Sequence, residues 1–315
     1  MFGCDRFFYY PNAVRYGTPD ELDLTYENVR FPTRDGSMLH GYWFPAQDTA
    51  DPASGIPGRH GSAVSSPSNG GRPLQIAGHR GPALQDDVTH SKDGGTQRAR
   101  GTVLHLHGNA GNVTGHFQHV AWLPAVGWNV LTFDYRGYGQ SEGSVTRENT
   151  IADAHAALNC LLHRPDVDPG RIVAFGQGLG GAIGIVLAAE RQEIRGFATD
   201  GAFDSYRAIV RWHIHRNPLL LCAAWWIPLV LRDDGFDPID SVARIAPRPL
   251  LIMHGTCDRV VDPRMARRLY DAAGEPRELW LAEGADHYGA LQDHCEQARL
   301  MLLDFFARCI GCEPG

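Results

Sequence analysis

The stretch VAFGQGLGGA, residues 173–182, can do chemistry because an apolar strand runs into a glycine-rich corner and leaves it as a small-residue helix. This layout is typical of the G-x-S-x-G nucleophile elbow, which exposes a serine hydroxyl at a sharp turn for attack on an acyl carbon. The apex of the corner is Gly178, where the motif requires serine. Glycine relieves most of the strain of such a turn, about 1–3 kcal/mol for a residue with a side chain. Gly178 therefore suits the turn but lacks the nucleophile.

Two residues further along the chain are of the types that such a nucleophile needs as partners. Asp258 follows the apolar run PLLIMHG (249–255), and His287 follows RELWLAE (277–283). A Ser-His-Asp site requires an imidazole within reach of the hydroxyl and a carboxylate on the other ring nitrogen. Because the carboxyl ends of neighbouring parallel strands converge on one crevice, we expect Asp258 to be the orienting acid and His287 the base. The chain order is then nucleophile, acid, base.

Other interpretations of these residues stay open from the sequence. Asp258 could cap a helix beginning at Pro263, and His287 could be a loop histidine that packs beneath a cap. Asp200, at the end of the run IRGFATD, is a rival acid. The histidines that we interpret as structural, at strand ends, are His105, His107 and His254. Cys257 follows the wrong strand to replace the nucleophile, and the family resemblance described below gives the turns of Ser141 and Ser205 no nucleophilic role.

The elements that must position these groups are predicted from the hydrophobic pattern. Strands are expected at 24–31, 38–44, 102–108, 129–135, 171–177, 194–200, 249–255 and 277–283. Helices are expected at 113–123, 147–164 and 179–190. After the first two strands, strands and helices alternate, which predicts an α/β fold with a mostly parallel sheet flanked by helices.

Two segments interrupt this alternation. Residues 47–98 are rich in Gly, Ser, Pro, Asp and His and contain no aromatic Phe, Trp or Tyr, so we predict a long disordered insertion. Residues 204–241 are dense in Trp, Leu and Arg and predict a small helical cap or lid. The apolar part of this cap, 218–231, is shorter than the ~20 residues of a membrane-spanning helix, so contact with a membrane surface is the rival interpretation. The whole chain, 1–315, is predicted to be a single domain.

Composition restricts the partners. A formal net charge of -7 argues against nucleic acid as a partner, because nucleic-acid readers present basic surfaces. Seven cysteines, an odd number, suggest no complete disulfide framework and predict a cytoplasmic protein, with membrane association through the cap as the alternative. The His and Cys spacings and the glycine pattern predict neither a metal nor an organic cofactor. The apolar cap favours a small-molecule acyl or otherwise hydrophobic ligand.

Five pieces of the sequence, in order, resemble the α/β-hydrolase superfamily, and within it the serine-aminopeptidase-like and acyl-hydrolysing branch. They are HGNAGN (107–112), FDYRGYGQSEG (133–143), GQGLGG (176–181), HGTCDRVVD (254–262) and GADHYG (284–289). The resemblance implies an α/β-hydrolase fold with Gly178, Asp258 and His287 at the triad positions. It also implies an oxyanion hole formed by the backbone N–H groups of Leu179 and of Asn109 or a neighbour in the same turn. The resemblance gives Asp134 and Arg136, in the second piece, structural roles.

The missing serine decides the functional prediction. Removing the nucleophile of a serine hydrolase lowers turnover by on the order of a millionfold. The sequence therefore predicts a homologue of acyl ester, thioester or peptide hydrolases that is catalytically impaired or inactive. One alternative is a non-catalytic binding protein for acyl or lipid-like ligands. Another is an active hydrolase in which Gly178 is an introduced or erroneous change, or in which water activated by His287 uses the space that serine leaves.

Overall fold

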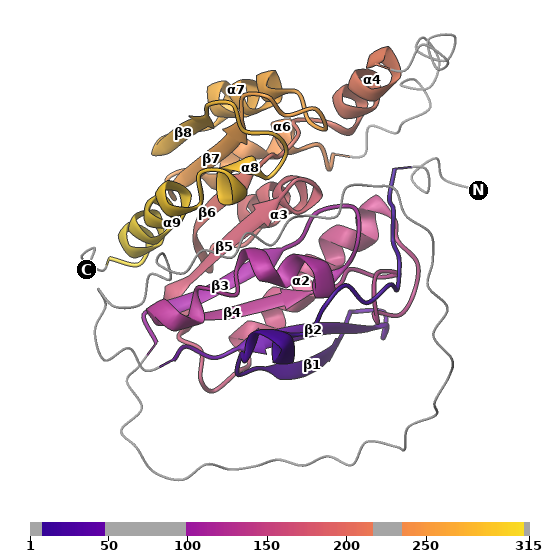
Figure 1. Cartoon of the computed structure of the whole chain (residues 1–315), viewed down its shortest axis with the longest axis vertical. Coiled ribbons are helices and arrows are strands. Elements are labelled where there is room, and N and C mark those ends of the chain that lie inside the picture. The colour runs from indigo at the N-terminus through magenta and orange to yellow at the C-terminus, as the bar shows by residue number, and fades with distance from the viewer. Residues whose placement is uncertain (1–7, 48–98, 217–234, 312–315) are drawn as a thin grey trace.

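The structure is a computed structural model that describes residues 8–47, 99–216 and 235–311. Most of the predicted insertion, 48–98, and the central part of the predicted cap, 217–234, lie outside the described residues. In the described part of the chain, eight strands form one sheet in the order β1-β2-β4-β3-β5-β6-β7-β8 (Figure 1). The strands are β1 (Glu27–Pro32), β2 (Met38–Phe44), β3 (Gly101–Leu106), β4 (Trp128–Phe133), β5 (Ile172–Gln177), β6 (Ile194–Asp200), β7 (Leu250–Gly255) and β8 (Arg277–Ala282).

The order in which the chain adds strands to the sheet reverses at β3. The strand β2 pairs antiparallel with β1 and β4, whereas β3 to β8 run parallel to one another. The strand β3 lies between β4 and β5, so the chain builds outward on one side of β3 and then returns to the other side. At such a switch point the connections after two neighbouring strands leave in opposite directions and open a crevice at their carboxyl ends. The segments after β3 and β5 are therefore where a ligand site is expected.

Helices cover both faces of the sheet. The α-helices are α1 (Val113–His116), α2 (Arg147–Leu162), α3 (Leu179–Glu190), α4 (Tyr206–Arg216), α6 (Pro238–Ser241), α7 (Pro263–Ala272), α8 (Gly289–Gln292) and α9 (Cys295–Cys309). The 3-10 helices are η2 (Pro19–Leu22), η3 (Phe117–His119), η4 (Pro124–Val126), η5 (Pro169–Arg171) and η7 (Val242–Ile245). Along β5, Ala174 packs into the core with α2, α3 and α7, and its neighbour Phe175 packs into the core with η3 and α9. Burial on both faces explains why these strands are continuous apolar runs in the sequence.

The predicted fold class is confirmed, and one predicted helix is wrong. The strands at 38–44 and 194–200 and the helix at 179–190 have the predicted bounds. The helix predicted at 113–123 is instead broken into α1, η3 and η4. Gly115 and the β-branched pair before it are poor helix formers, and the side chain of His116 turns back to the Ala110 carbonyl oxygen, 2.6 Å away. Among the described helices, none combines the length and apolarity needed to cross a bilayer.

Candidate active site

The elbow, Gln177–Leu179, joins β5 to α3. Gly178 has φ 52° and ψ -110°, in the region that strongly favours glycine, and its N–H donates to the Asp200 carbonyl oxygen at 2.9 Å. The following helix packs tightly, because a Cβ added at Gly180 would overlap the Leu106 carbonyl oxygen at the end of β3. The apex is thus held at the switch point by β6 on one side and by β3 on the other.

The predicted acid and base meet beside this apex. The distance from His287 Nδ1 to Asp258 Oδ2 is 2.7 Å, and the Asp258 side chain is fully buried. The other carboxylate oxygen of Asp258 accepts the N–H groups of Val260 and Val261 at 2.7 and 2.8 Å. The Asp258 bond places the proton of a neutral His287 on Nδ1, which leaves Nε2 as the acceptor. A Cβ added at Gly178 would lie 3.3 Å from this Nε2.

The Asp258 carboxylate also receives a second imidazole, which the sequence interpretation treats as structural. His254 Nε2 lies 3.1 Å from Asp258 Oδ2 and 3.2 Å from the Val261 carbonyl oxygen. Both neighbours are acceptors, so this nitrogen carries the proton. Burial acts to raise the pKa of Asp258, but the hydrogen bonds from His254 and His287 outweigh it and hold the pKa well below its usual range. Asp258 is therefore a stable carboxylate.

The alternative interpretations of the acid find less support in the geometry. The N-cap of α7 is Asp262, whose side chain accepts the N–H of Arg264 at 3.0 Å, so Asp258 is not needed as a cap. Asp200 is fully buried, and neither of its carboxyl oxygens has a hydrogen-bond partner among the described residues. Burial raises the pKa of Asp200 to about 7, so this carboxyl is a poor anion to orient His287.

The two residues predicted to form the oxyanion hole follow the neighbouring strands β5 and β3. Leu179 is the first residue of α3, where the N–H has no partner within the helix. Asn109 follows β3, and its amide donates to the Phe8 carbonyl oxygen at 2.7 Å. Its side-chain oxygen accepts the N–H of Tyr10 at 3.0 Å and the hydroxyl of Tyr138 at 2.8 Å. These contacts use the side chain of Asn109 to hold the turn, so its backbone N–H is the group that can face an oxyanion.

Asp134 and Arg136 make contacts that support the loop and helix beside β3. Asp134 accepts the N–H of Val113, at the start of α1, at 2.6 Å. The Nε of Arg136 donates to Asp153 of α2 at 2.6 Å, and both side chains are almost completely buried. These contacts fit structural roles, and they stabilise the α1 and α2 side of the site.

A tyrosine that the sequence interpretation does not use lies in the centre of the site. The Tyr288 hydroxyl would be 2.7 Å from a Cβ added at Gly178, and a Cβ added at Gly108 would overlap the same hydroxyl. Its ring lies against the His287 ring, with centroids 4.0 Å apart. The phenol of Tyr288 therefore lies beside the space that one alternative gives to a water molecule activated by His287. The signal available in the sequence is the tyrosine directly after His287 in GADHYG.

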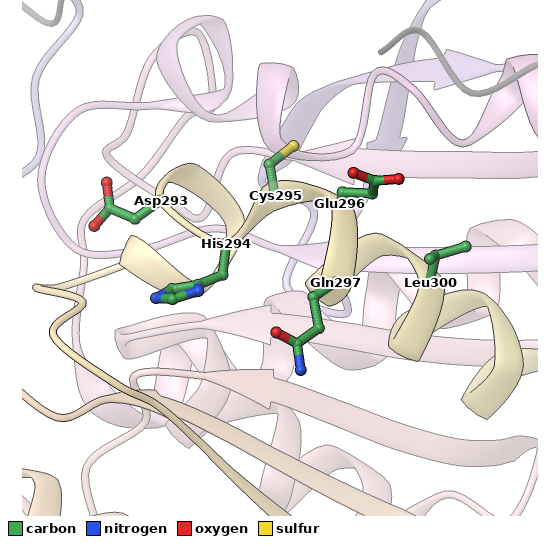
Figure 2. Close-up of a pocket in the computed structure, with 6 residues that line it drawn as sticks. All are labelled: Asp293, His294, Cys295, Glu296, Gln297 and Leu300. Atoms are coloured by element: carbon green, nitrogen blue, oxygen red, sulfur yellow. The ribbon is translucent and has the colours of Figure 1, made fainter.

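A hollow elsewhere on the surface is a weaker candidate for a site. Figure 2 shows its lining residues, Asp293, His294, Cys295, Glu296, Gln297 and Leu300. All six belong to one short segment, 293–300, at the start of α9, so among the described residues no second element faces this hollow to enclose a ligand. Within the described ranges, no group of three or more His, Cys, Asp or Glu side chains could hold a metal ion.

The eight-stranded sheet, the elbow after β5 and the Asp–His pair after β7 and β8 define an α/β-hydrolase. Residues 97–242 match the family model of the serine aminopeptidases S33. The chain is 31% identical to the uncharacterized protein YfhR of Escherichia coli K12 over 309 residues, which cover 97% of this chain and 88% of the relative. It is 33% identical to the uncharacterized protein Rv2307c of Mycobacterium tuberculosis, over 90% of this chain and 79% of the relative.

The chain therefore belongs to the α/β-hydrolase superfamily and to the same family as YfhR, and its residues 97–242 are similar to the serine aminopeptidases S33. A more distant relative is protein bem46 of Schizosaccharomyces pombe, which is 28% identical over 85% of this chain and 75% of its own length. Among solved structures, the Pyrococcus furiosus esterase Pf2001 superposes with a TM-score of 0.66 at 21% identity, covering 96% of this chain and 100% of the esterase. At that identity the superposition supports the fold alone.

Proposed function

We propose that this chain is an acyl-hydrolase homologue, of acyl ester, thioester or peptide hydrolase ancestry, in which catalysis by an elbow serine has been lost. The observation that carries this proposal is the orientation of His287. Its Nδ1 is bound to Asp258 at 2.7 Å, and its Nε2 faces the Cβ position of Gly178 at 3.3 Å. An imidazole so oriented is useful for deprotonating a hydroxyl at residue 178, yet glycine supplies none.

The rest of the acyl-transfer arrangement supports the same proposal. Asp258 remains a buried carboxylate that accepts four hydrogen bonds, two from imidazoles and two from backbone N–H groups. The N–H of Leu179 begins a helix and lies directly after the apex, which suits an oxyanion. We expect the ligand to be a small molecule with an acyl or otherwise hydrophobic group. Contact of the cap with a membrane surface belongs to the same proposal.

Restoring the serine tests this function. In Gly178→Ser the new Cβ would lie 2.7 Å from the Tyr288 hydroxyl, so the hydroxyl must shift, whereas Gly178→Ser with Tyr288→Phe removes the crowding oxygen. We expect the double variant to react with a fluorophosphonate probe and to hydrolyse short alkyl esters, such as ethyl esters, at least 100-fold faster than the unaltered chain. The single variant should show a smaller gain.

His287→Gln in the double variant is the matched control, and it should abolish both labelling and turnover. The readouts are probe labelling and steady-state ester hydrolysis, with the unfolding transition of each variant measured alongside. If the double variant neither labels nor turns over while it unfolds as cooperatively as the parent, the proposed function is wrong.

A further inference from the structure

The Tyr288 hydroxyl lies where a serine hydroxyl would act. It is within 2.7 Å of the Cβ position of Gly178, and it also lies against Gly108, where a Cβ would overlap it. Residues 108 and 178 are both glycine, and the Tyr288 phenol lies in the space that their side chains would otherwise occupy. His287 Nε2 and the Tyr288 hydroxyl surround the same point, at 3.3 and 2.7 Å from it. The base of the site and a hydroxyl group therefore approach the same point of the elbow, although the hydroxyl does not belong to residue 178.

The position of this tyrosine is imposed by its surroundings. Tyr288 has φ 61°, a left-handed conformation that is uncommon for a residue other than glycine and that is found at functional sites when the fold maintains it. Its ring packs edge-on against His119 and His116, with centroids 5.8 and 6.3 Å away. Burial lowers the pKa of both histidines, to about 4 for His119 and about 3 for His116, so the ring contacts uncharged imidazoles. These contacts keep the hydroxyl directed at the elbow.

We propose that the Tyr288 hydroxyl is the acyl acceptor of this site, in the place of the missing serine hydroxyl, and that the site acts on thioesters and aryl esters. This inference rests on the proposed function, because it requires that the Asp258 and His287 pair serve acyl transfer. Tyrosine is among the side chains that form covalent intermediates when an adjacent base activates them.

The chemistry is complete with the groups of this site and water. The Tyr288 oxygen attacks the acyl carbon while its proton passes to His287 Nε2, and the oxyanion that forms faces the N–H of Leu179. The bond to the leaving group then breaks, and His287 returns the proton to the leaving thiolate or phenolate. Water, deprotonated by His287, attacks the aryl ester on Tyr288. The acid is released, and the proton on His287 restores the tyrosine hydroxyl.

The substrate class follows from the leaving group. A phenol has an ordinary pKa of about 10 and a thiol of about 8.5, and burial, with the nearby carboxyls of Asp200 and Asp258, raises the pKa of Tyr288 further. A tetrahedral intermediate expels the weaker base, so a thioester loses its thiolate and acylates Tyr288. The anion of an alkyl alcohol or an amine is a much stronger base than phenolate, so the same intermediate from an alkyl ester or an amide returns to the substrate. A serine acceptor is itself an alkyl alcohol and lacks this restriction.

Mass spectrometry of the unaltered full chain tests the acceptor directly. The protein is incubated briefly with a p-nitrophenyl ester and, separately, with an acyl thioester of the same chain length, and is then quenched in acid. We expect a mass increase of one acyl group, located on Tyr288 after digestion. We also expect turnover of both substrates and at least 100-fold slower turnover of the matching ethyl ester. An adduct on another residue, or the absence of both adduct and turnover, overturns the proposal.

Tyr288→Phe keeps the ring and removes the hydroxyl, and Tyr270→Phe, on α7, is the matched control. We expect Tyr288→Phe to lose the adduct and at least 100-fold of the thioester and aryl ester turnover, and Tyr270→Phe to retain both. Turnover that persists in Tyr288→Phe contradicts the proposal. The double variant Gly178→Ser/Tyr288→Phe tests a different point, because it has no Tyr288 hydroxyl and reports only on the Asp258 and His287 pair acting with a serine. The two proposals can therefore fail independently.

Discussion

Two carboxyl groups near the elbow have pKa values shifted in opposite directions, because their surroundings differ. Asp258 is surrounded by hydrogen-bond donors from His254, His287 and two backbone N–H groups, which keep it ionised despite burial. Asp200 has no hydrogen-bond partner for its carboxyl oxygens among the described residues, and burial raises its pKa to about 7. The neighbouring charge of Asp258 acts in the same direction, and His254 and His287 oppose it. A pair of carboxyls with separated pKa values marks a site adapted for proton transfer.

The raised pKa of Asp200 predicts a pH dependence of stability. The pKa in the folded chain is about 7, against an ordinary value of 3.8, so the folded state binds more protons than the unfolded state between about pH 4 and 7. Stability therefore falls as pH rises through this window, by up to about 4 kcal/mol for a shift of this size. Asp200→Asn removes the titration. We expect urea unfolding of the variant to lose less stability than the parent between pH 5 and pH 8.

The difference between the two pH profiles isolates Asp200 from the other titrating groups that both proteins share. Profiles that run parallel between pH 5 and pH 8 would show that Asp200 is already ionised in the folded chain.

At the residue scale, the sequence predicts those site residues that directly follow a strand. It misses those whose position depends on the path of a turn. Asp258 and His287 could be chosen because each follows an apolar run, in the order that the chemistry requires. Tyr288 could not, because the direction of its side chain depends on a positive φ that no residue type at this position announces. The sequence gives His254 only a structural role, because the spacing of residues does not show that the loop after β7 brings Asp258 back to its imidazole.

Among the elements, the junction of β5 and α3 depends on close approach of two backbones. A Cβ at Gly180 would overlap the Leu106 carbonyl oxygen of β3. We therefore expect Gly180→Ala to destabilise the protein by about 3 kcal/mol or more, since backbone rather than a flexible side chain must move. Gly170→Ala, in η5, is the control, because its Cβ would meet the Asp168 side chain at 3.3 Å. Urea unfolding of both variants checks this, and equal stabilities would refute the packing argument.

Strands of this sheet could be predicted closely because they are buried on both faces, which gives short apolar runs ending at glycine or polar residues. The backbone of segment 113–123 is harder to predict, because its apolar residues pack on one face of the sheet whether the backbone is a single helix or several turns. There the broken geometry follows from contacts outside the segment. Asp134 fixes the first N–H of α1, and Ala110 receives the side chain of His116.

At the scale of the whole molecule, the two ends of the predicted insertion are anchored to the same turn. The N–H of Gln47 donates to the Pro124 carbonyl oxygen, and the N–H of Arg100 donates to the Gly127 carbonyl oxygen, both at 2.9 Å. Pro124 and Gly127 belong to η4 and the residue that ends it. Gln47 and Arg100 are therefore held close together, so few residues are needed to connect them.

Replacing residues 48–98 by a Gly/Ser linker of about eight residues tests whether the fold needs the insertion. Shortening a flexible closed loop in this way lowers the entropic cost of closing it, which predicts a gain in stability of about 1–2 kcal/mol. Thermal and urea unfolding measure the change, with the acyl-transfer assays run on the same protein. A large loss of stability would show that the segment packs on the domain and that the prediction of a disordered insertion is wrong.

The amide of Asn109 links the first described residues of the chain to the turn that follows β3, a hundred positions away in the sequence. Near the end of the described residues, Cys309 of α9 packs on Gly196 near the start of β6. The two contacts thus differ in what depends on them. A change in the path of the chain at Phe8 would disturb the turn after β3, beside the elbow, whereas a change at Cys309 would disturb the packing of α9 on β6.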